Sequence, residues 1–236
     1  MAYPRDEDKC VTAIMQTIRS DPDVALQCWY SRPQGGTLIE GPGIRLAEIA
    51  ANNWRNLAIR FSEVRVDDCH AIVTAEGWDM EANNAFSSTC RRRIYGNKDK
   101  HGRYLMEEVT VQAAKAIAYR DCVFKLIPAV YIREAKNAAM ETVDNLLATP
   151  AKLNATKKWV ADELKGYGVT PQQLKDTFGD SIAAMTASQL KGVLGLLNSL
   201  RSGYSWDRAT GGKRLTPGDG HVFRLADMDG AKEGGE

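Results

Sequence analysis

Groups that could carry out catalysis are sparse in this 236-residue chain. The sequence contains no phosphate-binding glycine loop, no G-x-S-x-G nucleophile motif, no H-E-x-x-H zinc motif and no Rossmann glycine pattern. Asp79 and Glu81 stand two residues apart and carry carboxylates that could bind a metal ion, but a solvated turn is the favoured interpretation. His70 follows Asp67 and Asp68, where a surface loop is again favoured. We therefore expect no catalytic residue, no metal site and no cofactor.

The five cysteines do not form the pattern of a disulfide framework or a zinc site. Their number is odd, their spacing is wide and no C-x-x-C pair occurs. Reduced, buried cysteines are the favoured interpretation, which suits a cytoplasmic protein. The polar and acidic start of the chain does not resemble a secretory signal, and no apolar run reaches the roughly 18 residues of a transmembrane helix.

Positive charge is concentrated in one part of the chain. The totals of 31 basic and 30 acidic residues give a net charge of +1, which neither favours nor excludes a nucleic-acid partner. Residues 91–103, however, contain six basic residues and one acidic residue. Residues 43–136 carry 15 basic and 12 acidic residues, whereas residues 1–42 carry four and six. This concentration predicts a surface for a polyanion, and the alternative is a charged strand edge that deters edge pairing.

Hydrophobic periodicity predicts the elements that position these charges. Three strand-like segments cover residues 57–66, 70–80 and 85–95, and their links are too short for parallel crossovers. We therefore expect an antiparallel three-stranded meander, packed on a long helix over residues 107–127, in an α+β fold. Further helices are expected over residues 5–20, 44–54 and 130–147, with a short hairpin over residues 24–39 between the first two.

Two features of the expected strands can be derived from alternation. The apolar residues of the first strand change parity between Phe61 and Val64, which predicts a β-bulge. On the third strand, Arg91, Arg93 and Tyr95 share the face opposite the apolar residues, while Arg92 falls on the apolar side. If the apolar face packs on the long helix, the opposite face presents two arginines to phosphates and one tyrosine to bases.

The chain is expected to divide into three parts. Residues 1–149 form the α+β core with the N-terminal helix and hairpin, and residues 150–203 form a small helical module. Within the module, Thr170 is the expected N-cap of a helix, with Pro171 at its first position. Residues 204–236 are rich in glycine and charge and are expected to form a flexible tail.

Three short motifs occur in a fixed order along the chain. They are G-P-G-I-R-L-A-E at 41–48, W-D-M-E-A-N at 78–83 and A-Y-R-D-C-V-F-K-L-I-P at 118–128. With the hairpin, the three strands and the long helix, this order resembles phage single-strand annealing proteins of the RecT, Redβ and Erf type. Their β-β-β-α core is shared with the eukaryotic single-strand-annealing ring proteins. The resemblance covers about residues 24–200.

This resemblance implies a function and a set of partners. The function is ATP-independent binding and annealing of complementary single-stranded DNA in phage-type homologous recombination, in the cytoplasm of a bacterial host. The implied assembly is a homo-oligomer, as a ring or helical filament, whose basic groove holds the DNA backbone. The implied partners are a phage exonuclease and the host single-strand-binding protein, with no membrane and no cofactor. A structural or regulatory phage protein that kept the fold without annealing DNA is the alternative, and an enzyme with an unrecognised site is the least favoured class.

The residues expected to bind DNA come from two sources. By position, the resemblance implies DNA contacts for five residues: Arg45, Arg91, Arg93, Arg120 and Lys125. Local charge adds five more to the predicted surface: Arg92, Lys98, Lys100, Arg103 and Lys115. Tyr95 is the candidate for base stacking. The basic residues of the long helix, Lys115, Arg120 and Lys125, are spaced five residues apart. This spacing places each about 140° around the helix axis from the one before it, so they need not form one stripe.

Overall fold

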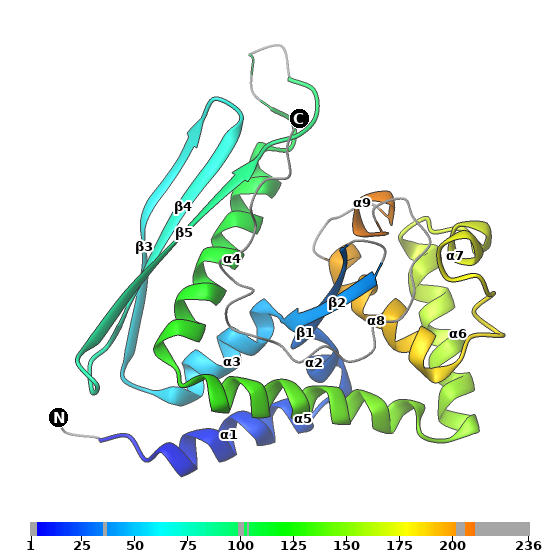
Figure 1. Cartoon of the computed structure of the whole chain (residues 1–236), viewed down its shortest axis with the longest axis horizontal. Helices are drawn as coiled ribbons and strands as arrows, with labels where there is room; N and C mark the ends of the chain where they lie inside the picture. The colour runs from blue at the N-terminus through cyan, green and yellow to red at the C-terminus, as the bar shows by residue number, and fades with distance from the viewer. Residues whose placement is uncertain (1–3, 35–36, 99–101, 103, 202–205, 211–236) are drawn as a thin grey trace. The chain divides into compact units, whose positions relative to one another are not determined.

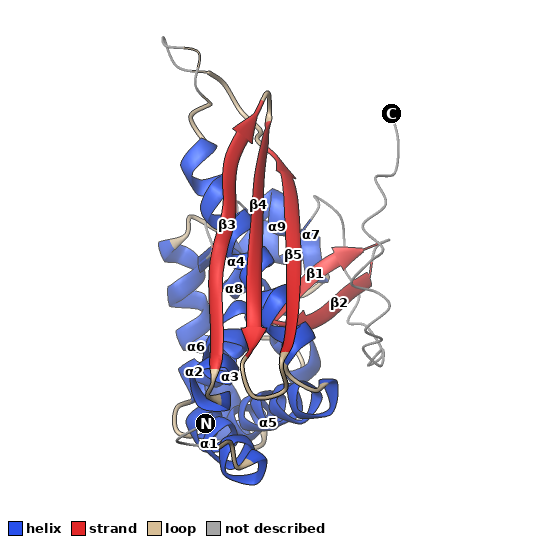
Figure 2. Ribbon diagram, turned by 90° about the vertical axis from the view of Figure 1, so that its left-hand side faces the viewer, coloured by secondary structure: helices blue, strands red, loops and turns tan. Residues whose placement is uncertain are grey.

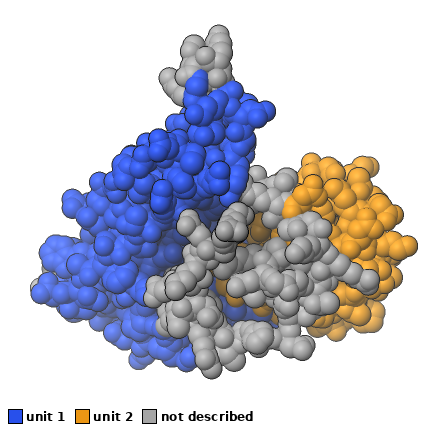
Figure 3. Space-filling view, turned by 45° about the horizontal axis from the view of Figure 1, so that its top comes forward, with its two compact units in different colours: residues 1–29, 42–146 blue, residues 30–41, 147–236 orange. Residues whose placement is uncertain are grey.

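The computed structural model describes residues 4–34, 37–98, 102, 104–201 and 206–210. The chain divides into two compact units, which Figure 3 colours separately. Unit 1 contains residues 1–29 and 42–146, and unit 2 contains residues 30–41 and 147–236. Residues 30–41, which were expected to belong to the N-terminal core, group with unit 2 in this division. Among the described residues, no helix has both the length and the apolar content needed to cross a bilayer.

Unit 1 combines helices with one antiparallel sheet (Figure 1). Its helices are α1 (Glu7–Arg19), α2 (Pro22–Gln27), α3 (Ile44–Trp54), α4 (Glu107–Leu126) and α5 (Ala129–Leu147). Its strands are β3 (Leu57–Asp67), β4 (His70–Asp79) and β5 (Asn84–Arg93), in the order β3-β4-β5. The α+β class and the three-stranded antiparallel sheet predicted from the sequence are therefore confirmed.

Residues 22–27 are helical, although they were expected to lie in or next to a hairpin strand. Asp21 caps α2, because its carboxylate accepts a hydrogen bond from the backbone N–H of Asp23 at 2.8 Å. Pro22 occupies the first turn, where its missing N–H costs nothing. The Asp-Pro-Asp segment thus follows the first helix and also begins the second. The hairpin itself is shorter and consists of β1 (Trp29–Gln34) and β2 (Thr37–Pro42).

The predicted bulge in β3 is confirmed. The pairing of β3 with β4 shifts register between Phe61 and Glu63. The extra residue reverses the alternation of β3, so the apolar residues before and after it lie on the same side of the sheet. That side faces α4, and Figure 2 shows the three strands in front of this helix. The opposite side of the sheet is called the outer face below.

Close packing between α4 and the sheet depends on small side chains. Those of the helix recur every four residues and are buried: Ala114, Ala118 and Cys122. Those of β4 that meet them are Ala71, Val73 and Ala75. At Gly77 a Cβ would lie 2.5 Å from Leu126 Cδ1 and 2.9 Å from Cys122 Sγ, so any side chain there would push the helix and the sheet apart.

Unit 2 contains the hairpin residues and a set of helices. The helices are α6 (Pro150–Gly166), α7 (Pro171–Phe178), α8 (Ala187–Arg201) and α9 (Trp206–Thr210). Thr170 forms a capping box with Gln173 at the start of α7, which confirms the predicted N-cap. Residues 206–210 were expected to lie in a flexible tail, but they form α9 and bury the side chain of Trp206. Residues 211–236 lie outside the described residues.

Candidate nucleic-acid interface

The outer face of β5 carries the two arginines that alternation predicted there. Arg91 pairs in register with Ile72, and Arg93 pairs with His70. Both arginine side chains are exposed, whereas Ile72, which pairs with Arg65 of β3 and Arg91 of β5, is buried. Arg92 lies on the side that faces α4, as expected. The division of the three consecutive arginines between two faces is thus confirmed.

The strand that carries Arg91 and Arg93 has no carboxylate of its own, and the two carboxylates on the same face of β3, Glu63 and Asp67, are both paired with Arg65. Between Asn84 and Arg93 the strand contains no aspartate or glutamate. A nitrogen of the Arg91 guanidinium lies 3.4 Å from Nδ1 of His70. The Arg93 guanidinium lies 5.6 Å from the ring centroid of Tyr95, which is 55% exposed. Among the described residues neither Arg91 nor Arg93 forms an ion pair, so both cations are available to an anionic ligand.

A second basic group lies on the helix-facing side of β5. Burial raises the pKa of the Cys90 thiol, while the nearby charges of Arg92 and Arg120 oppose that rise. Arg120 is also paired with Asp121 at 2.7 Å, which reduces its pull on a further anion. Lys125 lies 5.6 Å from the ring centroid of Phe86. These basic side chains are separated from Arg91 and Arg93 by the sheet itself, so the ten predicted residues do not form one surface.

The remaining predicted residues are dispersed. Lys115 lies 5.9 Å from the Phe61 ring on β3, which is the opposite edge of the sheet. Arg45 on α3 is paired with Glu48 at 2.9 Å. Lys98 lies 4.7 Å from the ring of Tyr104, in the connection between β5 and α4. The two other predicted residues of that connection, Lys100 and Arg103, lie outside the described residues.

The structure corrects the interpretation of Asp79 and Glu81 as a solvated turn. Asp79 is buried and accepts two hydrogen bonds of 2.8 Å from the guanidinium of Arg5. Glu81 accepts from the backbone N–H of Arg5 and, at 2.8 Å, from the side chain of Asn56. The Arg5 guanidinium also stacks 4.5 Å from the ring of Trp54. These carboxylates therefore hold the start of the chain against the end of the sheet, and neither is free to bind a metal ion.

Burial and hydrogen bonding act in opposite directions on Asp79. Burial alone raises the pKa of its carboxyl group. The hydrogen bonds from Arg5 and from the backbone N–H groups of Ala82 and Glu81 outweigh burial, so the pKa lies below its usual 3.8. The carboxylate therefore remains ionised at neutral pH, as the ion pair requires.

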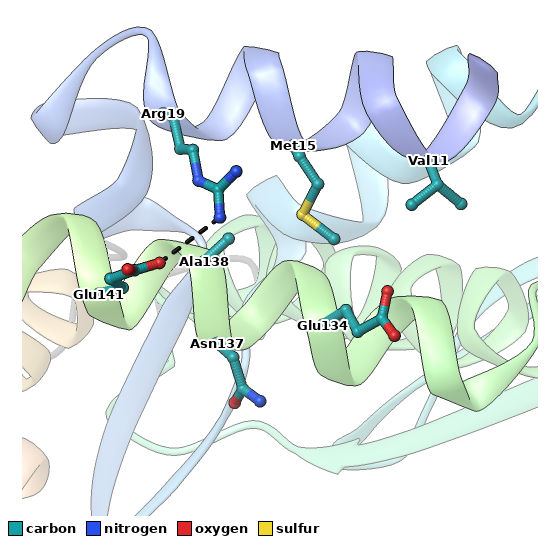
Figure 4. Close-up of a pocket in the computed structure, with 7 residues that line it drawn as sticks. All are labelled: Val11, Met15, Arg19, Glu134, Asn137, Ala138 and Glu141. Carbon is teal, nitrogen blue, oxygen red and sulfur yellow. Dashed lines mark hydrogen bonds and ion pairs between the residues drawn. The ribbon is translucent and has the colours of Figure 1, made fainter. Parts of the chain in front are cut away.

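A hollow between α1 and α5 is a poor site for a polyanion. Figure 4 shows Val11 and Met15 of α1 facing α5 across it, and its volume is about 490 Å³. An ion pair of 3.5 Å between Arg19 and Glu141 bridges the two helices at one end. Glu134 adds a further carboxylate to the lining, so the hollow offers a polyanion repulsion rather than attraction.

Sequence reasoning assigned no role to Trp78, which the structure places on the outer face. Trp78 is 48% exposed and pairs in register with Ala58 and Ala85. Alternation along β4 already separated Trp78 from the buried Ala75 and Gly77, so the signal was present in the sequence.

Comparison with known proteins does not extend these observations. No protein-family model, no curated protein and no solved structure matches the chain. Among the described residues there is no group of three or more side chains arranged to hold a metal ion. A functional assignment must therefore be argued from the geometry of the sheet.

Proposed function

We propose that the chain binds single-stranded DNA along β5 and promotes the annealing of complementary strands without ATP. The observation that carries the proposal is the acid-free strand β5, whose exposed Arg91 and Arg93 form no ion pair among the described residues. Sequence-independent binding requires positive charge along the DNA backbone and aromatic rings for the bases. Tyr95 beside Arg93 provides such a combination of ring and cation at this edge.

The resemblance to the single-strand annealing proteins supports the same proposal. The order of three antiparallel strands followed by a long helix matches the β-β-β-α arrangement of that core. Annealing breaks and forms no covalent bond, so it needs no nucleophile, metal ion or nucleotide site. We accordingly propose a DNA-binding protein rather than an enzyme.

The proposed function also needs many copies of the chain, and the β3 edge supports self-association. α4 lies mainly over β4 and β5. Three apolar side chains on the helix-facing side of β3 are consequently exposed: Phe61, Val64 and Val66. Apolar side chains grouped at a strand edge are typical of a surface that another protein covers. The proposal thus assigns DNA to the β5 edge and a further copy of the chain to the β3 edge.

Salt-dependent binding tests the proposal directly. The affinity for a fluorescent single-stranded oligonucleotide is measured by anisotropy at several salt concentrations. For the wild-type chain, log affinity should fall linearly with log salt concentration. Replacing Arg91 and Arg93 by alanine should lower the affinity and reduce the slope by about 1.4, because each phosphate contact on a single strand contributes about 0.7.

A matched variant controls for the loss of two positive charges. Arg19→Ala combined with Arg133→Ala removes two exposed arginines of unit 1 that lie on α1 and α5. This variant should keep the wild-type slope. If the wild-type chain does not bind the oligonucleotide at low salt, the proposal is refuted and a structural or regulatory role becomes the better assignment. If both double variants reduce the slope equally, the DNA does not follow β5.

A further inference from the structure

The outer face of the sheet contains a hollow that the basic residues discussed so far do not line. Its volume is about 850 Å³, and the side chains that shape it come from all three strands. No residue of α4 lines it, and six of its ten lining residues lie on the outer face by register, so it opens on that face: Ala58, Arg60, Glu76, Trp78, Ala85 and Ser87. Trp78 is the large aromatic side chain of the outer face at this place, and it is about half exposed.

The neighbours of Trp78 leave about half of its side chain exposed. The residues directly opposite it on β3 and β5 are both alanines, Ala58 and Ala85. Ser87 follows two positions further along the same face of β5. A methyl group or hydroxymethyl group cannot reach across an indole ring, so a flat ligand can stack on it.

The charges around this hollow do not repel a nucleic acid. Glu76 is the carboxylate among the residues that line it, and Arg60 donates two hydrogen bonds to it at 3.0 and 2.9 Å. The hydrogen bonds from Arg60 and from Ser62 lower the pKa of Glu76, so this group is ionised and its charge is balanced by Arg60. The side chain of Asn83, which also lines the hollow, adds a donor and an acceptor that suit the edge of a base.

The hollow is continuous with the basic end of β5. Of the residues on this face of β5, Ala85 and Ser87 line the hollow and Thr89 lies between it and Arg91, and none of the three is charged. The distance from Ala85 to Arg93 is eight residues, or about 27 Å at about 3.4 Å per residue. A single strand lying along this path can therefore place phosphates near the arginines and a base at the hollow.

We propose that Trp78 forms a nucleobase-stacking site on the outer face of the sheet. The ligand is an unpaired base of the same single strand whose phosphates contact Arg91 and Arg93, so the inference rests on the proposed function. Exposed aromatic side chains on a sheet surface are a general means of holding unpaired bases. The stacking energy is independent of base identity, which suits a protein that must accept any sequence.

The test separates base stacking from phosphate binding. Two oligonucleotides of equal length are compared, one of oligothymidine and one with abasic sites in its central part, so that their phosphates are the same. The wild-type chain should bind oligothymidine about five- to tenfold more tightly than the abasic oligonucleotide. Trp78→Ala should lose this preference and keep the affinity for the abasic oligonucleotide. Tyr167→Ala, which removes an aromatic ring of similar exposure in unit 2, should keep the preference.

A fluorescence measurement provides a second test that does not depend on correct folding of the alanine variant. Oligothymidine should quench tryptophan emission of the wild-type chain, and Trp78→Phe should abolish most of that quenching while retaining most of the affinity. Equal preference for oligothymidine in Trp78→Ala and in the wild type would overturn the inference but leave the proposed function standing. A smaller assembly of Trp78→Ala with unchanged base preference would assign this face to a protein contact instead. Failure of the wild-type chain to bind either oligonucleotide would refute both proposals.

Discussion

Replacement of Asp79 by asparagine tests how the start of the chain is attached to the sheet. The Asp79 carboxylate accepts five hydrogen bonds: two from Arg5, one from the indole N–H of Trp54 and two from backbone N–H groups. Asparagine is nearly isosteric, but it has one acceptor oxygen and an amide group that would face donors. The Arg5 side chain is only 6% exposed, so without Asp79 its buried charge would keep only the longer ion pair of 3.9 Å with Glu81.

The expected loss follows from this burial. Removing one partner of a buried ion pair typically costs about 3–5 kcal/mol, because the remaining charge loses its close counter-charge. If the free energy of unfolding falls by about 2 kcal/mol for each molar of urea, a loss of this size lowers the urea midpoint by about 2 M. The variant Arg5→Met/Asp79→Asn should be no less stable than Asp79→Asn alone, because it leaves no unpaired guanidinium.

Urea unfolding followed by tryptophan fluorescence measures these effects, and Trp54 contacts both partners of the pair. Glu76→Gln makes the same chemical change at a more exposed carboxylate of β4 and should shift the midpoint little. Because the pKa of Asp79 is lowered by folding, its contribution is fully present above pH 3.8 and is lost as the pH falls through the folded-state pKa. A midpoint for Asp79→Asn equal to that of Glu76→Gln would refute this account of the ion pair.

Three further expectations concern packing, capping and thiol reactivity. Gly77→Ala should destabilise the chain by about 1–3 kcal/mol, because the new Cβ would lie 2.5 Å from Leu126 Cδ1. Thermal unfolding measures this loss, and an unchanged melting temperature would mean that α4 can shift to make room for the methyl group. Thr170→Ala should cost about 1 kcal/mol through loss of the capping box of α7, whereas Thr170→Ser should retain most of the stability. Burial raises the pKa of the Cys28 thiol to about 12, so iodoacetamide at pH 8 should leave this thiol unmodified in the folded chain. Detection of labelled Cys28 by mass spectrometry would contradict its burial.

Local patterns predicted the features whose signal is carried by adjacent residues. The change of parity in β3 implied the bulge, because a strand can keep its apolar residues on one side only by inserting a residue. Alternation also predicted that Arg92 would face α4 while its two neighbours would not. The Thr170 cap followed from the same kind of short-range pattern.

Features that depend on distant residues could not be derived in this way. Asp79 and Glu81 have the composition of a solvated turn, and only their contact with Arg5 shows that they lie in a buried cluster. Likewise, the spacing of Lys115 and Lys125 on α4 did not indicate which strand each side chain would reach. They contact rings on opposite edges of the sheet, which depends on how α4 crosses it.

The contact between Arg5 and Asp79 has a consequence for synthesis on the ribosome. The two residues are 74 positions apart, which takes roughly 4–15 s at about 5–20 residues per second. During this interval α1 emerges without the carboxylate that holds its N-terminal flank, and much of the apolar surface that covers it has yet to be made. We therefore expect α1 not to be stably packed on the nascent chain at first, and to become protected from proteolysis only when β4 has left the exit tunnel.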